Sequence, residues 1–197
     1  MTTVELQKRS EKSQNLRVIQ VDETRSQARN REIARERLVE MIRAALVAPK
    51  RRIATKPTLG SQRLAFSAVA TDADLRAQLF GPAPAAEVLI GEVDGEPAGF
   101  ALFFHNFSTF LGKRGLYLED LFVRPAARGV GLGKHLMAAL ARIAVQRDCG
   151  RFEWSVLDWN APAIGFYRSI GATGMDEWTV QRLEGAALHA LAARDEL

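Results

Sequence analysis

The chain contains a single cysteine, Cys149, so no disulfide can form within it and no cysteine cluster can hold a metal ion. Its three histidines, His105, His135 and His189, lie far apart and lack ligand spacing, which predicts that no metal is bound. No run approaches the roughly 20 apolar residues that span a bilayer, and residues 2–15 have no apolar signal-peptide core. These absences predict a soluble, cytoplasmic protein.

Charge is unevenly distributed along the 197 residues. Residues 1–64 hold 15 Lys and Arg against 7 Asp and Glu, a net charge of +8, whereas residues 65–197 hold 12 against 16, a net charge of −4. An acidic half favours the approach of a cationic amine, whereas a basic first third suits either RNA or a solvated helix face. The length allows one full α/β domain with a small appendage and excludes two large domains.

Hydrophobic periodicity predicts the secondary structure in its order along the chain. Strands are expected at residues 16–21, 88–93, 98–104, 116–123, 152–157 and about 175–183, and helices at 30–47, 72–80, 132–147, 161–169 and from Glu184. The basic stretch at 50–63 is interpreted as a linker or exposed loop. The pattern indicates an α+β fold with a mixed, mostly antiparallel sheet.

A glycine-rich loop joins the strand at 116–123 to the helix that begins near Leu132. Its glycines at positions 129, 131 and 133 can direct several backbone N–H groups toward one anion, and the helix adds the positive end of its dipole. A plain tight turn between strand and helix would need one glycine rather than three at alternate positions. The loop therefore predicts a ligand that carries phosphate groups.

Two familiar phosphate-binding loops do not fit this spacing. A dinucleotide fingerprint would need its third glycine where Lys134 or Leu136 stands. A Walker loop would need a glycine at Arg128 and a Ser or Thr at His135. Both classes of nucleotide site are therefore excluded for this loop.

The remaining pattern is Arg-x-x-Gly-x-Gly, formed by Arg128, Gly131 and Gly133 directly after a strand. It resembles the acetyl-CoA loop of the GNAT N-acetyltransferases. Motifs similar to those of the same family follow in the family's order: Asn160, then Phe166-Tyr167, then Gly171-Ala172. With the sequence Leu-Tyr-Leu-Glu-Asp-Leu-Phe-Val ahead of the loop, the chain resembles the diamine and polyamine (spermidine/spermine-type) N-acetyltransferases over about residues 72–194. The resemblance implies their three-layer α/β/α acyl-CoA N-acyltransferase fold.

The resemblance also implies transfer of an acetyl group from acetyl-CoA to a primary amine. An alkylamine with a pKa near ~10 is protonated at neutral pH, so a carboxylate must accept its proton. By resemblance this base is Glu119, and Asp120 contacts the amine or forms a buried salt bridge. Successive strand residues face opposite sides, so both acids share one cleft only if the strand has a bulge. Tyr167 is the expected general acid, and Trp159 is expected to contact the cationic acceptor.

The implied acetyl-CoA site extends from the end of the strand into the next helix. Backbone N–H groups of Leu121 and Val123 are expected to polarise the carbonyl group. Asn160 is expected to bind the pantetheine amides, besides being a good helix cap, and Arg168 to approach a phosphate. The complete set of expected cofactor-binding residues is Leu121, Phe122, Val123, Arg128, Gly129, Val130, Gly131, Leu132, Gly133, Lys134, Asn160 and Arg168.

The acceptor stays open at this point between a diamine, a polyamine and a lysine analogue. Where the polyamine enzymes carry an acid and a tryptophan before the catalytic strand, this chain has Ser108 and Phe110. This departure disfavours spermidine. The family resemblance also implies a homodimer, and nothing indicates a membrane partner.

The first third of the chain has a resemblance of its own. Residues 9–63 resemble the late part of the peptidyl-tRNA-hydrolysing domain of release-factor-like ribosome-rescue proteins, but the Gly-Gly-Gln loop of that family is absent. The acetyltransferase part, residues 64–197, lacks a recognisable first strand and first helix. We therefore expect residues 1–63 to supply an atypical strand and helix in their place. The alternative is a ribosome-associated or RNA-associated protein in which this basic segment is the working part.

Overall fold

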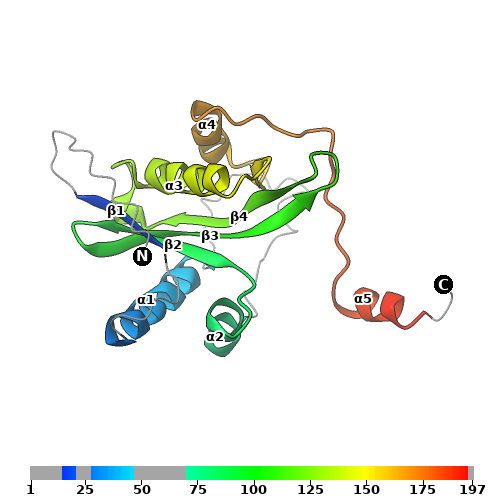
Figure 1. The fold of residues 1–197 in the computed structure, drawn as a ribbon, viewed down its shortest axis with the longest axis horizontal. Helices are drawn as coiled ribbons and strands as arrows, with labels where there is room; N and C mark the ends of the chain where they lie inside the picture. The colour runs from blue at the N-terminus through cyan, green and yellow to red at the C-terminus, as the bar shows by residue number, and fades with distance from the viewer. Residues whose placement is uncertain (1–14, 21–27, 47–69, 195–197) are drawn as a thin grey trace, which may run out of the picture. The chain divides into compact units, whose positions relative to one another are not determined.

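A computed structural model of the chain describes residues 15–20, 28–46 and 70–194 (Figure 1). The five strands of its sheet lie in the order of the sequence: β1 (Leu16–Gln20), β2 (Glu87–Val93), β3 (Glu96–Ser108), β4 (Lys113–Val123) and β5 (Phe152–Trp154). The first three pairings are antiparallel, and β4 pairs with β5 in parallel. This confirms the mixed, mostly antiparallel sheet.

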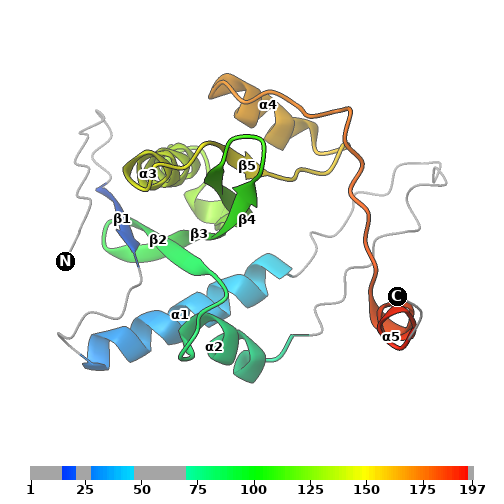
Figure 2. The same cartoon turned by 45° about the vertical axis from the view of Figure 1, so that its right-hand side comes forward.

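Helices cover both faces of this sheet, which gives the expected three layers (Figures 1 and 2). One face carries α1 (Ala28–Leu46) and α2 (Asp72–Phe80), and the other carries α3 (Leu132–Gln146). A short 3-10 helix, η2 (Pro125–Ala127), precedes α3. Residues 1–155 form one compact unit, and a second, residues 156–197, contains α4 (Ala161–Ser169) and α5 (Gly185–Ala192).

The first strand and the first helix belong to the sheet and its core. β1 pairs with β2 from Leu16↔Val93 to Gln20↔Leu89. On α1, Leu38 and Met41 have no exposed surface, and they pack with Val88 of β2 and Phe100 of β3. Apolar residues at helical spacing on α1 thus meet the apolar residues that alternate along the strands. A division of the chain at residues 63 and 64 stays a prediction.

The opposite face of the sheet is shaped to receive the start of α3. A Cβ atom at Gly91 would lie 2.8 Å from the Leu132 side chain, and one at Gly99 would lie 2.6 Å from the Phe122 carbonyl oxygen and 3.3 Å from Leu132. The two glycines therefore let the first residue of α3, which is buried, pack close against the strands. Further along α3 the buried residues are Leu136, Met137, Ala139, Leu140, Ile143 and Ala144.

Two predictions about the last part of the sheet are wrong. The strand expected at about 175–183 is absent, because this stretch has a turn at residues 176–177 and is otherwise irregular. The Trp178 N–H donates to the Met175 carbonyl oxygen at 3.1 Å, so a local turn takes the place of extended backbone here. β5 ends at Trp154 rather than at residue 157. The linker expected at 50–63 lies outside the described residues.

Candidate active site

The pairing of β3 with β4 is interrupted at Glu119. Leu102 pairs with Asp120, and the next residue of β3, Phe103, pairs with Leu118. Glu119 is therefore an extra residue in β4, which defines a β-bulge. The bulge occurs where the sequence requires one if both acids are to serve a single cleft.

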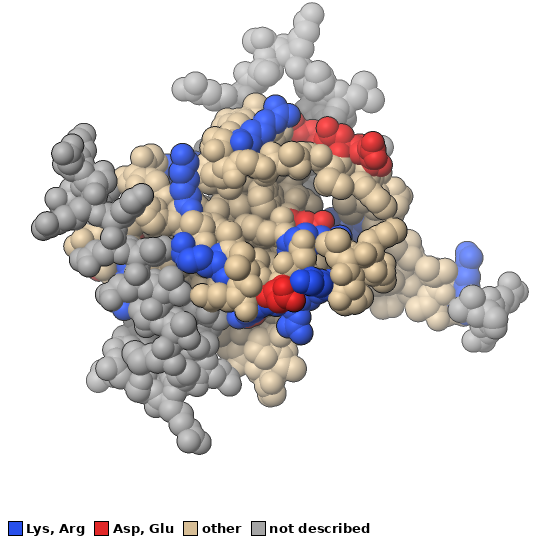
Figure 3. Space-filling view, turned by 45° about the horizontal axis from the view of Figure 1, so that its top comes forward, with Lys and Arg blue, Asp and Glu red and all other residues tan. Residues whose placement is uncertain are grey.

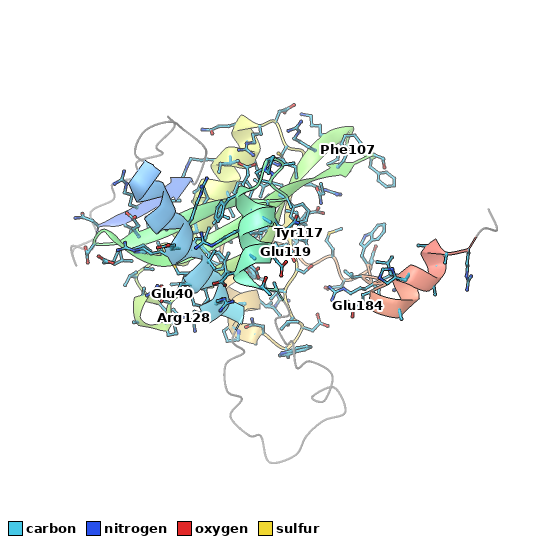
Figure 4. The ribbon with its side chains drawn as sticks, turned by 90° about the horizontal axis from the view of Figure 1, so that it is seen from below. Glu40, Phe107, Tyr117, Glu119, Arg128 and Glu184 are labelled. Atoms are coloured by element: carbon cyan, nitrogen blue, oxygen red, sulfur yellow. The ribbon has the colours of Figure 1, made fainter. Side chains whose placement is uncertain are left out.

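The bulge directs both carboxylates to the face that carries α1 and α2. Leu102 packs against the core cluster on that face, and residues paired across a sheet point to the same side. Asp120 therefore shares this face with Leu102. Figure 4, which views the molecule from this side, shows Glu119 there as well, beside Tyr117. Both acids are exposed, so an acceptor can reach them.

The electrostatics of the pair differ from those of a salt bridge. The pKa of Asp120 is raised above its ordinary value of 3.8, first because its carboxyl group is desolvated and then because of the nearby Glu119 charge. Within the described residues no Lys or Arg forms an ion pair with Asp120. Two carboxylates that have no ion-pair partner in the described part of the chain favour the binding of a cation such as an ammonium group.

The C-terminal part of β4, which carries Glu119 and Asp120, is not paired with β5. That pairing covers only Leu116↔Phe152 to Leu118↔Trp154. From Glu119 to Val123, β4 has no partner on the β5 side among the described residues, although β3 still pairs with it. The Arg124 N–H donates to the Ala98 carbonyl oxygen, so two residues earlier the backbone groups of Phe122 also face β3. Those of Leu121 and Val123 face the open edge, which suits hydrogen bonds to an extended ligand.

The loop after β4 leads into a cradle of backbone N–H groups at the start of α3. Gly131 caps α3 with φ at 93°, and no side chain caps the helix. The first N–H groups of a helix have no partners within it, so those of Leu132, Gly133 and Lys134 remain for an anion. Gly129 also has a positive φ of 88°, which favours glycine. The Leu132 side chain belongs to the core, so only its backbone can take the predicted cofactor role.

The cradle is part of a basic stretch of the chain. Residues 121–147 contain five Lys and Arg and no Asp or Glu. Figure 3, in which the α3 side comes forward, shows Lys and Arg side chains at several points of this face. Arg128 and Lys134 are exposed beside the cradle, so their charges can reach a phosphate. Both features fit the phosphates of acetyl-CoA.

The second unit carries the other predicted residues on and before α4. Asn160 caps this helix, because its Oδ1 accepts the Ala163 N–H at 3.3 Å, so its predicted capping role is confirmed. Burial raises the pKa of Tyr167 above 10.0, which keeps the phenol protonated at neutral pH. Trp159 is 57% exposed, and Arg168 lies in the last turn of α4.

The face of the sheet that carries α1 and α2, with Glu119 and Asp120, is called the acceptor face below. It also holds a row of polar residues that was not predicted. The row consists of Asn106, Tyr117, Arg151, Glu153 and Ser155. The Tyr117 and Ser155 hydroxyls lie 2.7 Å apart, and the Arg151 Nε lies 2.9 Å from a Glu153 carboxylate oxygen. The alternation of polar residues at positions 151, 153 and 155 is the sequence signal that could have found this row.

Within the described ranges, no three His, Cys, Asp or Glu side chains come together to hold a metal ion. The described helices include none that is long and apolar enough to cross a membrane.

A carboxylate pair on a bulged strand, followed by an N–H cradle, is compatible with transfer of an acyl group from a phosphate-bearing carrier to an amine. Residues 57–172, more than half of the chain, match the Acetyltransferase (GNAT) family, so the chain belongs to this family. The expected fold and enzyme class are thereby confirmed. The resemblance of residues 9–63 to ribosome-rescue proteins stays a prediction.

Similar proteins agree with this membership. The chain is 50% identical over 94 residues to an L-ornithine N5-acetyltransferase of Arabidopsis thaliana, covering 48% of this chain and 41% of that protein. It is 37% identical over 131 residues to a thialysine N-epsilon-acetyltransferase of Sus scrofa, covering 61% and 76%. An integron cassette protein from the mobile metagenome of V. cholerae has a similar structure, with a TM-score of 0.64, 25% identity and coverage of 91% and 98%.

Proposed function

We propose that this protein transfers the acetyl group of acetyl-CoA to the terminal primary amine of a small cationic acceptor, a diamine or a basic amino acid. The observation that carries the proposal is the bulge at Glu119, which brings two carboxylates to the open end of β4 directly before the cradle. The relatives named for ornithine and thialysine support an acceptor with a terminal amine.

Acetyl-CoA, when bound, supplies an acetyl thioester. The N–H groups at the start of α3, with Arg128 and Lys134, would hold its phosphates, and the open edge of β4 would hold its extended arm. Asn160 is proposed to bind the same arm and Arg168 a phosphate. These assignments use the residues present and require no metal.

Glu119 and Tyr167 are proposed to carry out the proton transfers. Glu119 accepts the proton of the ammonium group, which leaves a neutral amine able to attack the carbonyl carbon. Asp120 attracts and orients the cation. As the new C–N bond forms and the C–S bond breaks, Tyr167 donates its phenolic proton to the departing sulfur, and the second proton released by the nitrogen restores the phenol. Trp159 contributes an aromatic face for the cation.

The proposal is tested by an acceptor screen and one substitution. Purified protein with acetyl-CoA is offered diamines, polyamines and basic amino acids, and the free thiol that is released is measured. Glu119→Gln keeps the shape of the side chain but removes the proton acceptor, so its activity should recover at alkaline pH, where more of the amine is neutral. Glu96→Gln makes the same change at an exposed site at the start of β3 and should leave the pH profile as it is. A wild-type profile for Glu119→Gln would place the base elsewhere.

Oligomeric state is proposed separately. The family resemblance supports a homodimer, and light scattering of the purified protein would measure its mass in solution. A monomeric mass would remove this proposal without affecting the chemistry at β4.

A further inference from the structure

Arg151 and Glu153 lie on the acceptor face but take no part in the chemistry described for Glu119 and Asp120. We infer that this ion pair binds the α-carboxylate and α-ammonium groups of an amino-acid acceptor and so selects it over a plain diamine. The inference rests on the proposed function, because it concerns the far end of the same acceptor.

The register of the sheet places the pair on this face. Tyr117 of β4 pairs with Phe104 of β3 on one side and with Glu153 of β5 on the other. Tyr117 and Phe104 rings are 5.2 Å apart, and paired residues share a face. Glu153 therefore lies on the face of Tyr117, where Figure 4 also shows Glu119.

Arg151 reaches the same face across a glycine. A Cβ atom at Gly115 would lie 3.0 Å from the Arg151 Cγ and 3.2 Å from its Nε. Gly115 thus leaves room for the arginine to lie over β4. The Arg151 Nε lies 2.9 Å from a Glu153 carboxylate oxygen, and the Asn106 amide donates to the same oxygen at 3.1 Å. Both charged groups are held in place, and each side chain keeps 35% of its surface exposed.

The spacing suits an amino acid with a terminal amine. The row of Tyr117 and Glu153 lies two residues before that of Glu119, which is about 6.6 Å along a strand. Four bonds separate the terminal nitrogen of ornithine from its Cα, a span of about 5 Å for bonds near 1.5 Å. With the terminal amine at Glu119, the α-ammonium group therefore comes within reach of Glu153. Its carboxylate comes within reach of the planar fork of Arg151.

Charge explains why a plain diamine would bind less well. The second ammonium group of a diamine would approach Glu153, but Arg151 already neutralises that carboxylate. The diamine also has no anionic group to bind the guanidinium. An α-amino acid matches both charges of the pair. Arg151 therefore acts against the diamine as well as for the amino acid.

The test compares L-ornithine with 1,4-diaminobutane, which is ornithine without its carboxylate. Wild-type protein should have the higher kcat/KM for ornithine. Arg151→Gln should lower kcat/KM for ornithine about 10- to 100-fold, the usual scale for a lost hydrogen bond between charged groups. The same change should raise kcat/KM for diaminobutane, because Glu153 then lacks its cation. Glu153→Gln should lower both values.

Controls separate selectivity from structural damage. Arg151→Lys keeps the charge without the fork and should restore part of the ornithine activity. Lys113→Gln breaks an exposed ion pair with Asp148 at the far end of β4 and should change neither acceptor. An equal fall for both acceptors in a folded Arg151→Gln protein would overturn the inference.

A measurement on wild-type protein covers the case in which Arg151→Gln does not fold. L-Norvaline has the α-amino acid end of ornithine but no terminal amine, so it should compete with ornithine without being acetylated. No competition at ten times the KM of ornithine would overturn the inference. Wild-type activity on diaminobutane but not on ornithine would also overturn it and would leave the proposed function intact. Activity on no amine would instead refute the proposed function.

Discussion

The Nε of Arg128 donates a hydrogen bond of 3.0 Å to the carbonyl oxygen of Val123. Val123 is the last residue of β4, and Arg128 follows η2, so the bond closes the loop onto the end of the strand. This bond fixes the glycine loop that begins at Gly129, and with it the N–H cradle at the start of α3, to the strand that carries the two carboxylates. Changes to the cradle should therefore act on acetyl-CoA binding before they act on the acceptor.

Gly131→Ala should weaken acetyl-CoA binding. Gly131 has φ at 93°, and an alanine in such a left-handed conformation costs about 1–2 kcal/mol, so the cap and its N–H groups should shift. Calorimetric titration with acetyl-CoA measures the loss of affinity. The matched control is Gly95→Ala, which has a similar φ of 84° in the β2–β3 turn with open space around it. It should lower stability without lowering affinity, and an equal loss of affinity in both variants would contradict the assignment of the loop.

Asp120→Asn should stabilise the protein at neutral pH while reducing its activity. The folded protein raises the pKa of Asp120 above 3.8, so the protonated acid is favoured in the folded state. This contribution to stability is fully present below pH 3.8 and is lost as the pH rises through the raised pKa. At pH 7 the charged aspartate therefore opposes folding, and an uncharged asparagine relieves this effect.

Thermal unfolding at two pH values checks the sign. The Tm of Asp120→Asn should exceed that of the wild type at pH 7, and the difference should shrink below pH 3.8. Asp148→Asn removes an exposed aspartate paired with Lys113 and should change the Tm little, because exposed ion pairs contribute little. A Tm for Asp120→Asn below wild type at pH 7 would mean that the charge of Asp120 is compensated.

Tyr167→Phe should lower kcat by about 10²-fold, the usual scale of general acid assistance, with acetyl-CoA affinity nearly unchanged. Burial raises the pKa of this phenol above 10.0, so the group that is lost is a protonated acid over the whole neutral range. Steady-state kinetics and calorimetric titration together provide the test. If kcat stays at the wild-type value, the departing sulfur takes its proton from another donor.

Removal of residues 1–63 should make the remaining chain aggregate or unfold without a cooperative transition. The deletion removes β1 and α1, whose Leu38 and Met41 are fully buried, and uncovers Val88 and Phe100. Met41→Ala should cost about 2–5 kcal/mol, whereas Glu40→Ala on the exposed side of α1 should cost little. A soluble, active 64–197 protein would favour the RNA-associated alternative, in which the full chain binds RNA with a steep salt dependence.

The sequence predicts the sheet well because local periodicity and packing agree there. Glycine spacing located the cradle, and two of its three glycines, Gly129 and Gly131, have positive φ values. The second unit was predicted less well, because a stretch with apolar residues such as 175–183 forms a strand only when a partner strand is present. Pairing is a long-range property, and no local pattern reports it.

The acceptor face shows the same limit. The motif identified Glu119 and Asp120, and strand geometry specified that a bulge was needed, but only the register shows where the extra residue lies. Arg151 and Glu153 escaped notice because they adjoin β4 only through parallel pairing with a strand more than 30 residues later in the chain. Neighbours across a sheet are set by topology, so sequence order gave no reason to group them with Glu119 and Asp120.

The bulge makes the chemistry of β4 dependent on the number of residues as well as on their identity. If one residue were deleted at this point, pairing with β3 would become regular, and strand alternation would allow only one of two adjacent side chains to face the acceptor. Loss of the Glu119 codon would thus leave a regular, well-packed sheet that lacks one of its two carboxylates. For descendants of this gene, a one-residue deletion here is a route from an enzyme to a stable but inactive homologue.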